Sequence, residues 1–311
     1  MAIGLDRLRE SQPWTARDLR RWIVPLSIVT VVALRLPFLT HAPTPDEAGF
    51  LLVGGQWHPG GSSLYGNYWV DRPPLLIGIF QIASALGGLP ALRLIGCLAA
   101  AATVGGSSLA AGLVAGKRAS RWAAIAAAAL CTTPLLGTVA VNGELLAGPF
   151  VVAGIAAAIG ALKTDDEGRA RLFGIAAGAA AISAMMIKQN FADVFVFGLV
   201  ATVVAWHRRD IGTARFFRVL SSAIAGAALA LFALAVFTLA QGTSLSGVYD
   251  AMYPFRFEAD RVIAAGGSQY ATARLFTMLL AAAASGIVLL FAAAGWGIAA
   301  KRLYGAAAWG L

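Results

Sequence analysis

The chain has 311 residues, of which 59% are hydrophobic and only 13% are charged, with 24 Lys and Arg against 15 Asp and Glu. That is about half the charge of an ordinary soluble domain, so a water-soluble globular protein is excluded. The net charge of +9 comes from short basic clusters between apolar stretches. This spacing is typical of membrane topology and argues against a nucleic-acid partner.

Apolar stretches long enough for an α-helix to cross about 30 Å of hydrocarbon recur along the whole chain. Alanine-rich runs such as Ala123–Leu130 favour helices over the alternating strands of a barrel. We therefore predict an all-α, polytopic transmembrane helix bundle in which residues 1–311 form one transmembrane domain. About eight full spans are expected, at 23–39, 92–115, 122–140, 145–162, 172–188, 191–206, 219–240 and 275–299.

The two ends of the chain leave alternatives open. The basic start followed by an apolar run resembles a cleaved signal peptide, but the run is long and Pro43 follows a poor cleavage site. We expect a retained first helix. At the other end, Gly305–Leu311 looks like the start of another apolar helix, which raises the alternative of a shortened chain.

The short apolar segment 74–88 decides the predicted topology. If it does not cross completely, most of the 24 Lys and Arg residues lie on the cytoplasmic side, as the positive-inside rule requires. We therefore predict a short interfacial or partly inserted helix there. The protein is then an integral plasma or inner membrane protein with a cytoplasmic N-terminus. Its loops 40–73, 141–144 and 241–274 lie on the non-cytoplasmic face.

Small residues recur at helical spacing inside the expected spans. The patterns Gly112-x-x-x-Gly116 and Gly174-x-x-x-Gly178 are interpreted as close helix contacts within the bundle, not as a dimer signal. The two cysteines, Cys97 and Cys131, lie in apolar segments. They support neither a disulfide framework nor a four-ligand zinc site.

The loop 40–73 is long for a helix connection and rich in aromatic residues, which predicts interfacial helices within it. A helix that starts near Asp46 would hold Asp46 and Glu47 at the favourable end of its dipole. The two ends of the loop are Pro45-Asp46-Glu47 and Asp71-Arg72-Pro73-Pro74.

These motifs resemble the first outer loop of membrane-embedded glycosyltransferases of the dolichyl-phosphate-mannose protein mannosyltransferase and aminoarabinose lipid A transferase type, which have the GT-C fold. In that family the loop begins D-E-x-x-Y and ends in an acidic residue followed by K-P-P or K-P. Here Phe50 replaces the tyrosine and Arg72 the lysine. Two later segments also resemble the family, a short outer loop with an acid and a helix end with a lysine. They are Ala140-Val141-Asn142-Gly143-Glu144 and Met186-Ile187-Lys188-Gln189.

The resemblance implies transfer of a hexosyl or pentosyl group from a polyprenyl-phosphate donor to an acceptor hydroxyl of a glycan, lipid or protein. Asp46 would be the general base, and Glu47 would orient the acceptor or share a divalent cation with Asp46. Arg72 and Lys188 would bind the donor phosphate. The other expected substrate-binding residues are Asp71, Glu144, Gln189, Tyr253 and Arg256. No cofactor is predicted apart from that open divalent cation.

Simpler interpretations exist for each residue and for the whole chain. Asp46 and Glu47 fit a helix cap, Arg72 an interfacial anchor, and Lys188 a snorkelling lysine. The chain could instead be a secondary transporter or flippase for a lipid-linked or anionic substrate, or a non-catalytic degenerate homologue. Transporters hold ionisable groups near the midplane, whereas the acids named above fall in predicted outer loops.

Overall fold

The structure is a computed structural model that describes residues 20–137, 139–265 and 269–299. Within these ranges every regular element is helical, and the only strand-like pairings are two isolated bridges in the first loop. The prediction of an all-α chain is therefore confirmed. Residues 1–19 and the tail from Lys301 lie outside the described residues, and so do the expectations about them.

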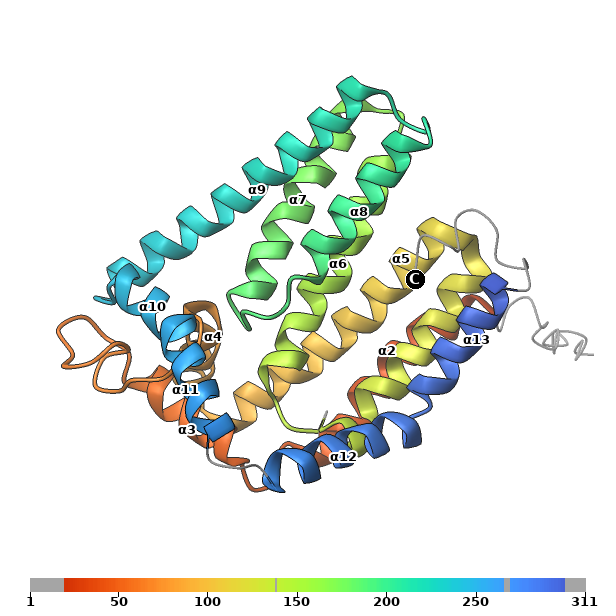
Figure 1. The fold of residues 1–311 in the computed structure, drawn as a ribbon. Helices are drawn as coiled ribbons and strands as arrows, with labels where there is room; N and C mark the ends of the chain where they lie inside the picture. The colour runs from red at the N-terminus through yellow and green to blue at the C-terminus, as the bar shows by residue number, and fades with distance from the viewer. Residues whose placement is uncertain (1–19, 138, 266–268, 300–311) are drawn as a thin grey trace, which may run out of the picture.

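The helices are spread along the whole described chain (Figure 1). They are α2 (Ile23–Arg35), α3 (Pro45–Gly55), α4 (Pro74–Ala85), α5 (Leu89–Thr132), α6 (Gly143–Lys163), α7 (Glu167–Met185), α8 (Asp193–His207), α9 (Thr213–Ala240), α10 (Leu245–Met252), α11 (Pro254–Ala265), α12 (Gln269–Ala284) and α13 (Ile287–Ala299). Short 3-10 turns follow α2 and α5.

Several of these helices have the length and composition of membrane spans. α5, α6 and α9 meet both criteria among the described residues. A fourth candidate is the pair Thr272–Ala284 and Ile287–Ala293, which is bent by 62°. The described residues therefore include three or four helices that are long and apolar enough to cross a membrane, while the expected total of eight crossings stays a prediction.

α5 is a helical hairpin and not one straight rod. The backbone leaves the helical conformation at Ala115 and Gly116, where Gly116 has a φ of +77°. Across this turn the Oγ atoms of Ser108 and Ser120 lie 2.8 Å apart. In a straight helix the same separation in sequence would span about 18 Å. The chain therefore reverses, and we call residues 89–114 the outgoing arm and 117–132 the returning arm.

The hairpin agrees with two separate predicted segments, but two predicted boundaries are wrong. The segment 122–140 ends as a helix at Thr132, because Pro134 cannot continue the hydrogen-bond ladder. The segment 275–299 is broken between α12 and α13, where Gly286 has a φ of +79°. Both breaks lie inside stretches that are apolar throughout, so hydropathy alone does not reveal them.

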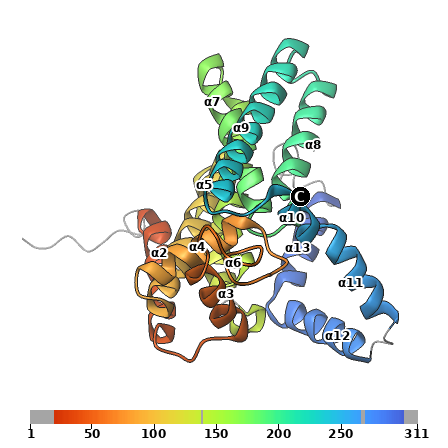
Figure 2. The same cartoon turned by 90° about the vertical axis from the view of Figure 1, so that its left-hand side faces the viewer.

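The helices form two groups that α5 and α6 join (Figures 1 and 2). In one group α6, α7, α8 and α9 pack together, and in the other α2 packs against α5. α7 and α9 pack closely at Gly178, where a Cβ would lie 1.8 Å from the carbonyl oxygen of Ala223. The interpretation of Gly174-x-x-x-Gly178 as a contact within the bundle is therefore confirmed. Gly116, in contrast, forms the hairpin turn.

The bundle has two chemically different ends. At the first, Lys163 donates a hydrogen bond to the carbonyl oxygen of Leu113, and Arg215 donates one to that of Leu162 at 3.1 Å. We call this the basic end; it comprises 113–121, 163–171 and 208–218. We call the opposite end the loop end; it comprises 36–73, 133–137, 139–144, 186–193 and 241–256.

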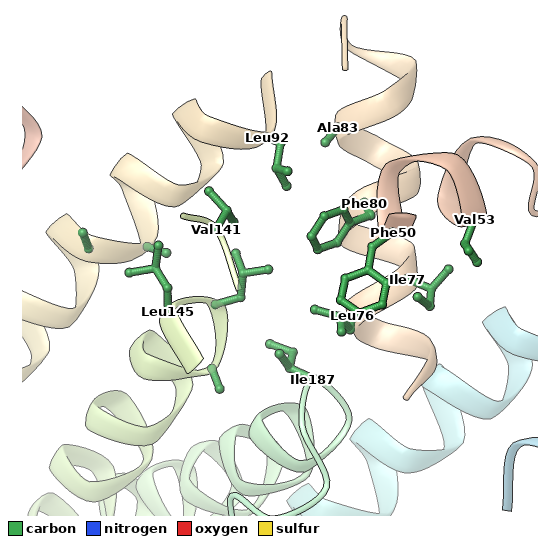
Figure 3. Packing of buried hydrophobic residues seen from close by; sticks show 14 of the residues in the cluster. Phe50, Val53, Leu76, Ile77, Phe80, Ala83, Leu92, Val141, Leu145 and Ile187 are labelled. Atoms are coloured by element: carbon green, nitrogen blue, oxygen red, sulfur yellow. The ribbon is translucent and has the colours of Figure 1, made fainter. Parts of the chain in front are cut away.

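A buried hydrophobic cluster packs beneath the loop end (Figure 3). Phe50 of α3 and Phe80 of α4 pack edge to face, with ring centroids 5.4 Å apart. Figure 3 shows Val141, Leu145 and Ile187 facing these rings from other segments. Helix α3, helix α4, the 139–144 segment and the end of α7 therefore share one core, which holds their polar residues in fixed relative positions.

α4 is the helix expected at 74–88, and its 12 residues give a length of about 18 Å. This is too short to cross about 30 Å of hydrocarbon. Leu76, Ile77 and Phe80 are fully or almost fully buried, so protein covers much of the helix. The prediction of a short helix is confirmed, and its depth in the membrane stays a prediction.

Candidate active site

The acidic motif of the first loop lies in the first turn of α3. Thr44 is the N-cap residue, and its side chain accepts a hydrogen bond from the backbone N–H of Glu47. In return, the Glu47 carboxylate accepts one from the backbone N–H of Thr44 at 2.9 Å. This reciprocal capping box fixes the start of the helix. The prediction of a helix that starts near Asp46 is confirmed.

Glu47 is fully buried and is held by groups from three segments. Its Oε1 atom accepts hydrogen bonds from Arg93 Nε at 3.3 Å and from the Val141 backbone N–H at 3.0 Å. Its Oε2 atom lies 3.0 Å from Arg93 Nη2. Burial alone would raise the pKa of Glu47, but the hydrogen bonds from Arg93, Thr44 and Val141 hold that pKa below its ordinary value. Glu47 therefore joins α3, α5 and the 139–144 segment as one unit.

Asp46 is in the opposite situation. Its carboxylate is exposed and makes no hydrogen bond or ion pair with any residue that the structure describes. Consecutive helix residues point about 100° apart, so Asp46 faces away from the Glu47–Arg93 pair. Protein donors already occupy the roughly four lone-pair sites of the Glu47 carboxylate.

The positions of Asp46 and Glu47 determine whether the two carboxylates can share the divalent cation considered in the sequence analysis. Glu47 has no lone pair left to share a cation with Asp46. Among the described residues, no three His, Cys, Asp or Glu side chains are grouped so that they could hold a metal ion. The structure thus brings Asp46 and Glu47 to the same end of the bundle but does not point them at one ligand.

The motif that ends the first loop, Asp71-Arg72-Pro73-Pro74, contacts α11 through Arg256. Asp71 bridges two cations, with Arg72 Nη1 2.8 Å from Oδ1 and Arg256 Nη2 2.8 Å from Oδ2. Tyr65 is fully buried and donates its hydroxyl hydrogen to the carbonyl oxygen of Arg72 at 2.5 Å. Burial raises the pKa of Tyr65, so the hydroxyl keeps this proton. The Arg72 guanidinium also lies over the ring of Phe50, 5.6 Å from its centroid.

Lys188 and Glu144 form an ion pair at the same end. Glu144 lies in the first turn of α6, and Lys188 follows the end of α7. The backbone N–H of Leu76 donates to the carbonyl oxygen of Met186 at 3.2 Å, which ties the start of α4 to the Lys188 turn. The charge of Arg72 also acts on the Glu144 carboxylate. We call this group the charge cluster; it comprises Asp71, Arg72, Glu144, Lys188 and Arg256.

The remaining expected residues lie close to the charge cluster in the sequence. Gln189 follows Lys188 directly, and its buried Oε1 atom accepts no hydrogen bond in the described part of the chain. Buried acceptors are normally satisfied, so this one is suited to a ligand. Tyr253 is half-buried and packs against Tyr249, with ring centroids 5.5 Å apart.

The sequence analysis missed Arg93 and Arg35. Both are buried near the loop end, and Arg35 donates hydrogen bonds to the carbonyl oxygens of Cys131 and Val139 at 3.3 Å. A signal was present, because an arginine inside an apolar stretch requires an internal partner. The partner itself is not readable from the sequence, since Glu47 precedes Arg93 by 46 positions.

A groove runs along the outer surface between α6 and α8. Its first part has a volume of about 600 Å³ and extends from Asn190 and Asp193 to Arg208. A second part of about 440 Å³ shares Phe197, Ala201 and Arg208 with the first and reaches the basic end. The walls between these ends are mostly apolar. The groove therefore begins two residues after Lys188 and continues along the length of α8.

No protein-family model, curated protein or solved structure matches the chain. The resemblance to GT-C glycosyltransferases therefore rests on the motifs in the sequence.

Proposed function

We propose that this protein is a membrane-embedded glycosyltransferase that acts at the loop end, on the non-cytoplasmic side, with a polyprenyl-phosphate sugar as donor. One observation carries the proposal. Three cations and two carboxylates from separate segments meet at the end of the bundle where Asp46 is exposed and has no partner in the described chain.

The proposed reaction is a direct displacement. Asp46 accepts the proton of the acceptor hydroxyl, and that oxygen attacks the anomeric carbon of the donor sugar. The bond between the anomeric carbon and the phosphate oxygen breaks as the new bond forms. The polyprenyl phosphate leaves with the bonding electron pair, and the anomeric centre is inverted.

The charge cluster supplies the cations that such a leaving group requires. Arg72 can donate two parallel hydrogen bonds to a phosphate, and Lys188 provides a compact positive charge. Without a donor, Glu144 occupies Lys188, and both side chains are partly exposed, at 53% and 34%. A phosphate can therefore replace the Glu144 carboxylate on Lys188 at a small cost in free energy, because water can solvate the released carboxylate. The unsatisfied Gln189 oxygen lies next along the chain, and as an acceptor it suits a hydroxyl group of the sugar and not the phosphate.

The groove between α6 and α8 supports a lipid-linked donor. It begins at Asn190, and its apolar walls suit an isoprenoid chain. With the phosphate at Lys188, the chain of the lipid would run along α8 toward the basic end. Glu47 and Arg93 then act as positioning residues, because they hold α3 against the 139–144 segment that carries Glu144.

The same groove favours a flippase as the second candidate. Its two parts extend from Asn190 to Lys163 and Arg208 at the basic end, which is a continuous path for a lipid chain. The enzyme remains the better proposal, because the charge cluster lies at helix ends and loops and not at the middle of spans.

The test is turnover by the purified full-length protein with a panel of labelled polyprenyl-phosphate sugars. We expect release of polyprenyl phosphate, and Asp46→Asn should lower its rate by about 100-fold to 10,000-fold. Asp250→Asn, an exposed acid at the loop end outside the charge cluster, should change the rate by less than about twofold, since it has no role in proton transfer. Retained turnover in Asp46→Asn removes Asp46 from the mechanism. Lipid translocation without phosphate release identifies the flippase, and no turnover of any donor supports a degenerate homologue.

A further inference from the structure

A separate pocket lies at the basic end, between the start of α2 and the returning arm of α5. It has a volume of about 470 Å³. Its lining residues come from two segments that are far apart in the sequence. They are Arg20, Ile23, Arg118, Arg121, Trp122 and Ile125.

Among the residues that the structure describes, the lining includes three arginines and no acidic residue. Arg20 and Arg118 make no side-chain hydrogen bond or ion pair with the residues that the structure describes, and Arg121 uses its Nε atom on the carbonyl oxygen of Lys117 at 3.0 Å. Elsewhere at the basic end, Lys163 and Arg215 donate hydrogen bonds to backbone carbonyl oxygens, and Arg218 pairs with Glu167 at 2.5 Å. The pocket therefore concentrates positive charge that the described protein does not neutralise.

The rest of the pocket is apolar and faces outward. Trp122 is 63% exposed and Ile125 is 41% exposed, although both follow directly on a basic turn. Tryptophan prefers the headgroup level of a membrane, with aliphatic residues deeper in the hydrocarbon. The pocket thus places cations, an interfacial ring and apolar side chains in the order in which a phospholipid places phosphate, glycerol and acyl chain.

The two helices that form the pocket run in the same direction. Arg35, at the end of α2, donates to the carbonyl oxygen of Cys131 at the end of the returning arm. Arg20 and Arg118 lie at the opposite ends of the same two helices. The pocket therefore lies about one helix length from the loop end, at the opposite end of the bundle.

We propose that this pocket binds the headgroup of an anionic phospholipid in the leaflet at the basic end. A phosphate group is the shared chemistry of lipid and soluble anions, and the apolar half of the pocket assigns the lipid. Basic pockets between membrane helices bind anionic lipid headgroups in this way. The site is independent of the proposed transfer reaction, because no residue of the charge cluster takes part in it.

The experiment measures lipid bound to the purified full-length protein by native mass spectrometry, with phosphatidylglycerol or phosphatidylcholine added at equal concentration. We expect phosphatidylglycerol to be retained at least about tenfold better, because each nearby cation strengthens binding of an anionic lipid. Arg118→Gln combined with Arg121→Gln should remove most of that preference. Arg118→Lys combined with Arg121→Lys should retain most of it, which separates lost charge from lost folding.

The matched control is Arg169→Gln combined with Arg171→Gln, two exposed arginines at the basic end outside the pocket. It should leave the lipid preference unchanged. Equal retention of the two lipids by the wild-type protein, or an equal loss in the control pair, overturns the proposal. A third arm adds inorganic phosphate or glycerol 3-phosphate as competitor. Displacement of the lipid by either at equimolar concentration would show a soluble-anion site and also overturn it.

Discussion

Two ion pairs at the loop end join the same kinds of group in opposite surroundings. Glu47 and Arg93 have side chains that are 0% and 6% exposed, whereas Glu144 and Lys188 are 53% and 34% exposed. The Glu47 carboxylate accepts hydrogen bonds from three residues, while the Glu144 carboxylate accepts one side-chain hydrogen bond in the described structure, from Lys188. The first pair has no capacity left for a ligand, and the second can exchange its partner.

The difference separates a structural acidic residue, Glu47, from an exchangeable one, Glu144, at the same end of the bundle. Breaking a buried pair leaves an uncompensated charge in a low-dielectric interior, while breaking an exposed pair leaves both groups to water. The buried pair therefore determines whether the loop end assembles. The exposed pair determines what the loop end can bind. Four changes test this assignment, in order of decreasing expected effect.

The largest effect is expected from Arg93→Leu. It leaves the Glu47 carboxylate buried without its cation, which costs about 3–5 kcal/mol of stability. The matched change in the exposed pair is Lys188→Leu, which should cost less than about 1 kcal/mol because water replaces the lost partner. Unfolding midpoints of both purified variants in the same detergent check the difference. Similar losses in the two variants would contradict the division into a structural and an exchangeable pair.

The second prediction concerns donor binding, where the exposed pair should dominate. Lys188→Met should weaken binding of polyprenyl phosphate about tenfold, because a charge-assisted hydrogen bond to the phosphate is lost. Glu144→Gln should have the opposite sign and tighten binding severalfold, because the competing carboxylate on Lys188 is removed. Titration of the labelled lipid phosphate measures both. If both variants weaken binding, Glu144 contacts the ligand directly and does not compete with it.

The sequence predicted the local features of the loop end but not its long-range contacts. The start of α3 followed from Thr44, Pro45 and Glu47, which are adjacent and determine a helix cap through local hydrogen bonds. The partner of Glu47 did not follow, because tertiary packing of α3 against α5 selects it. The convergence of Asp71 with Arg256 likewise depends on α11, which lies 185 positions later.

Helix lengths were predictable from hydropathy only where no backbone break interrupted an apolar stretch. Pro134 ends the returning arm and Gly286 breaks the last apolar stretch, yet Pro149 lies inside α6, which continues past it. A proline in a helix removes one hydrogen bond, and the surrounding packing decides whether the helix tolerates the loss. The composition of the segment does not determine that packing.

The third change tests the hydrogen bond that connects the buried Tyr65 to Arg72 of the charge cluster. Tyr65→Phe removes the hydrogen bond that a buried hydroxyl donates to the carbonyl oxygen of Arg72. The loss should cost about 1 kcal/mol of stability, since that carbonyl is left without this donor. It should also raise KM for the donor more than it lowers kcat, because Arg72 is less firmly positioned. Tyr68→Phe in the same loop, at a residue whose side chain is exposed, is the control and should leave both quantities unchanged.

The last prediction concerns how strongly protein stability depends on pH through Glu47. Because the folded-state pKa of Glu47 lies below the ordinary value of 4.5, the folded protein binds fewer protons than the unfolded chain in that range. The stabilisation is complete above pH 4.5 and is lost as the pH falls through the lowered pKa. Melting temperature measured from pH 7 down to about 3 should therefore drop more steeply in the wild type than in Glu47→Gln, which has no carboxylate to titrate. Parallel profiles for the two proteins would mean that the Glu47–Arg93 pair does not control acid stability, and the comparison between the two ion pairs would lose its structural half.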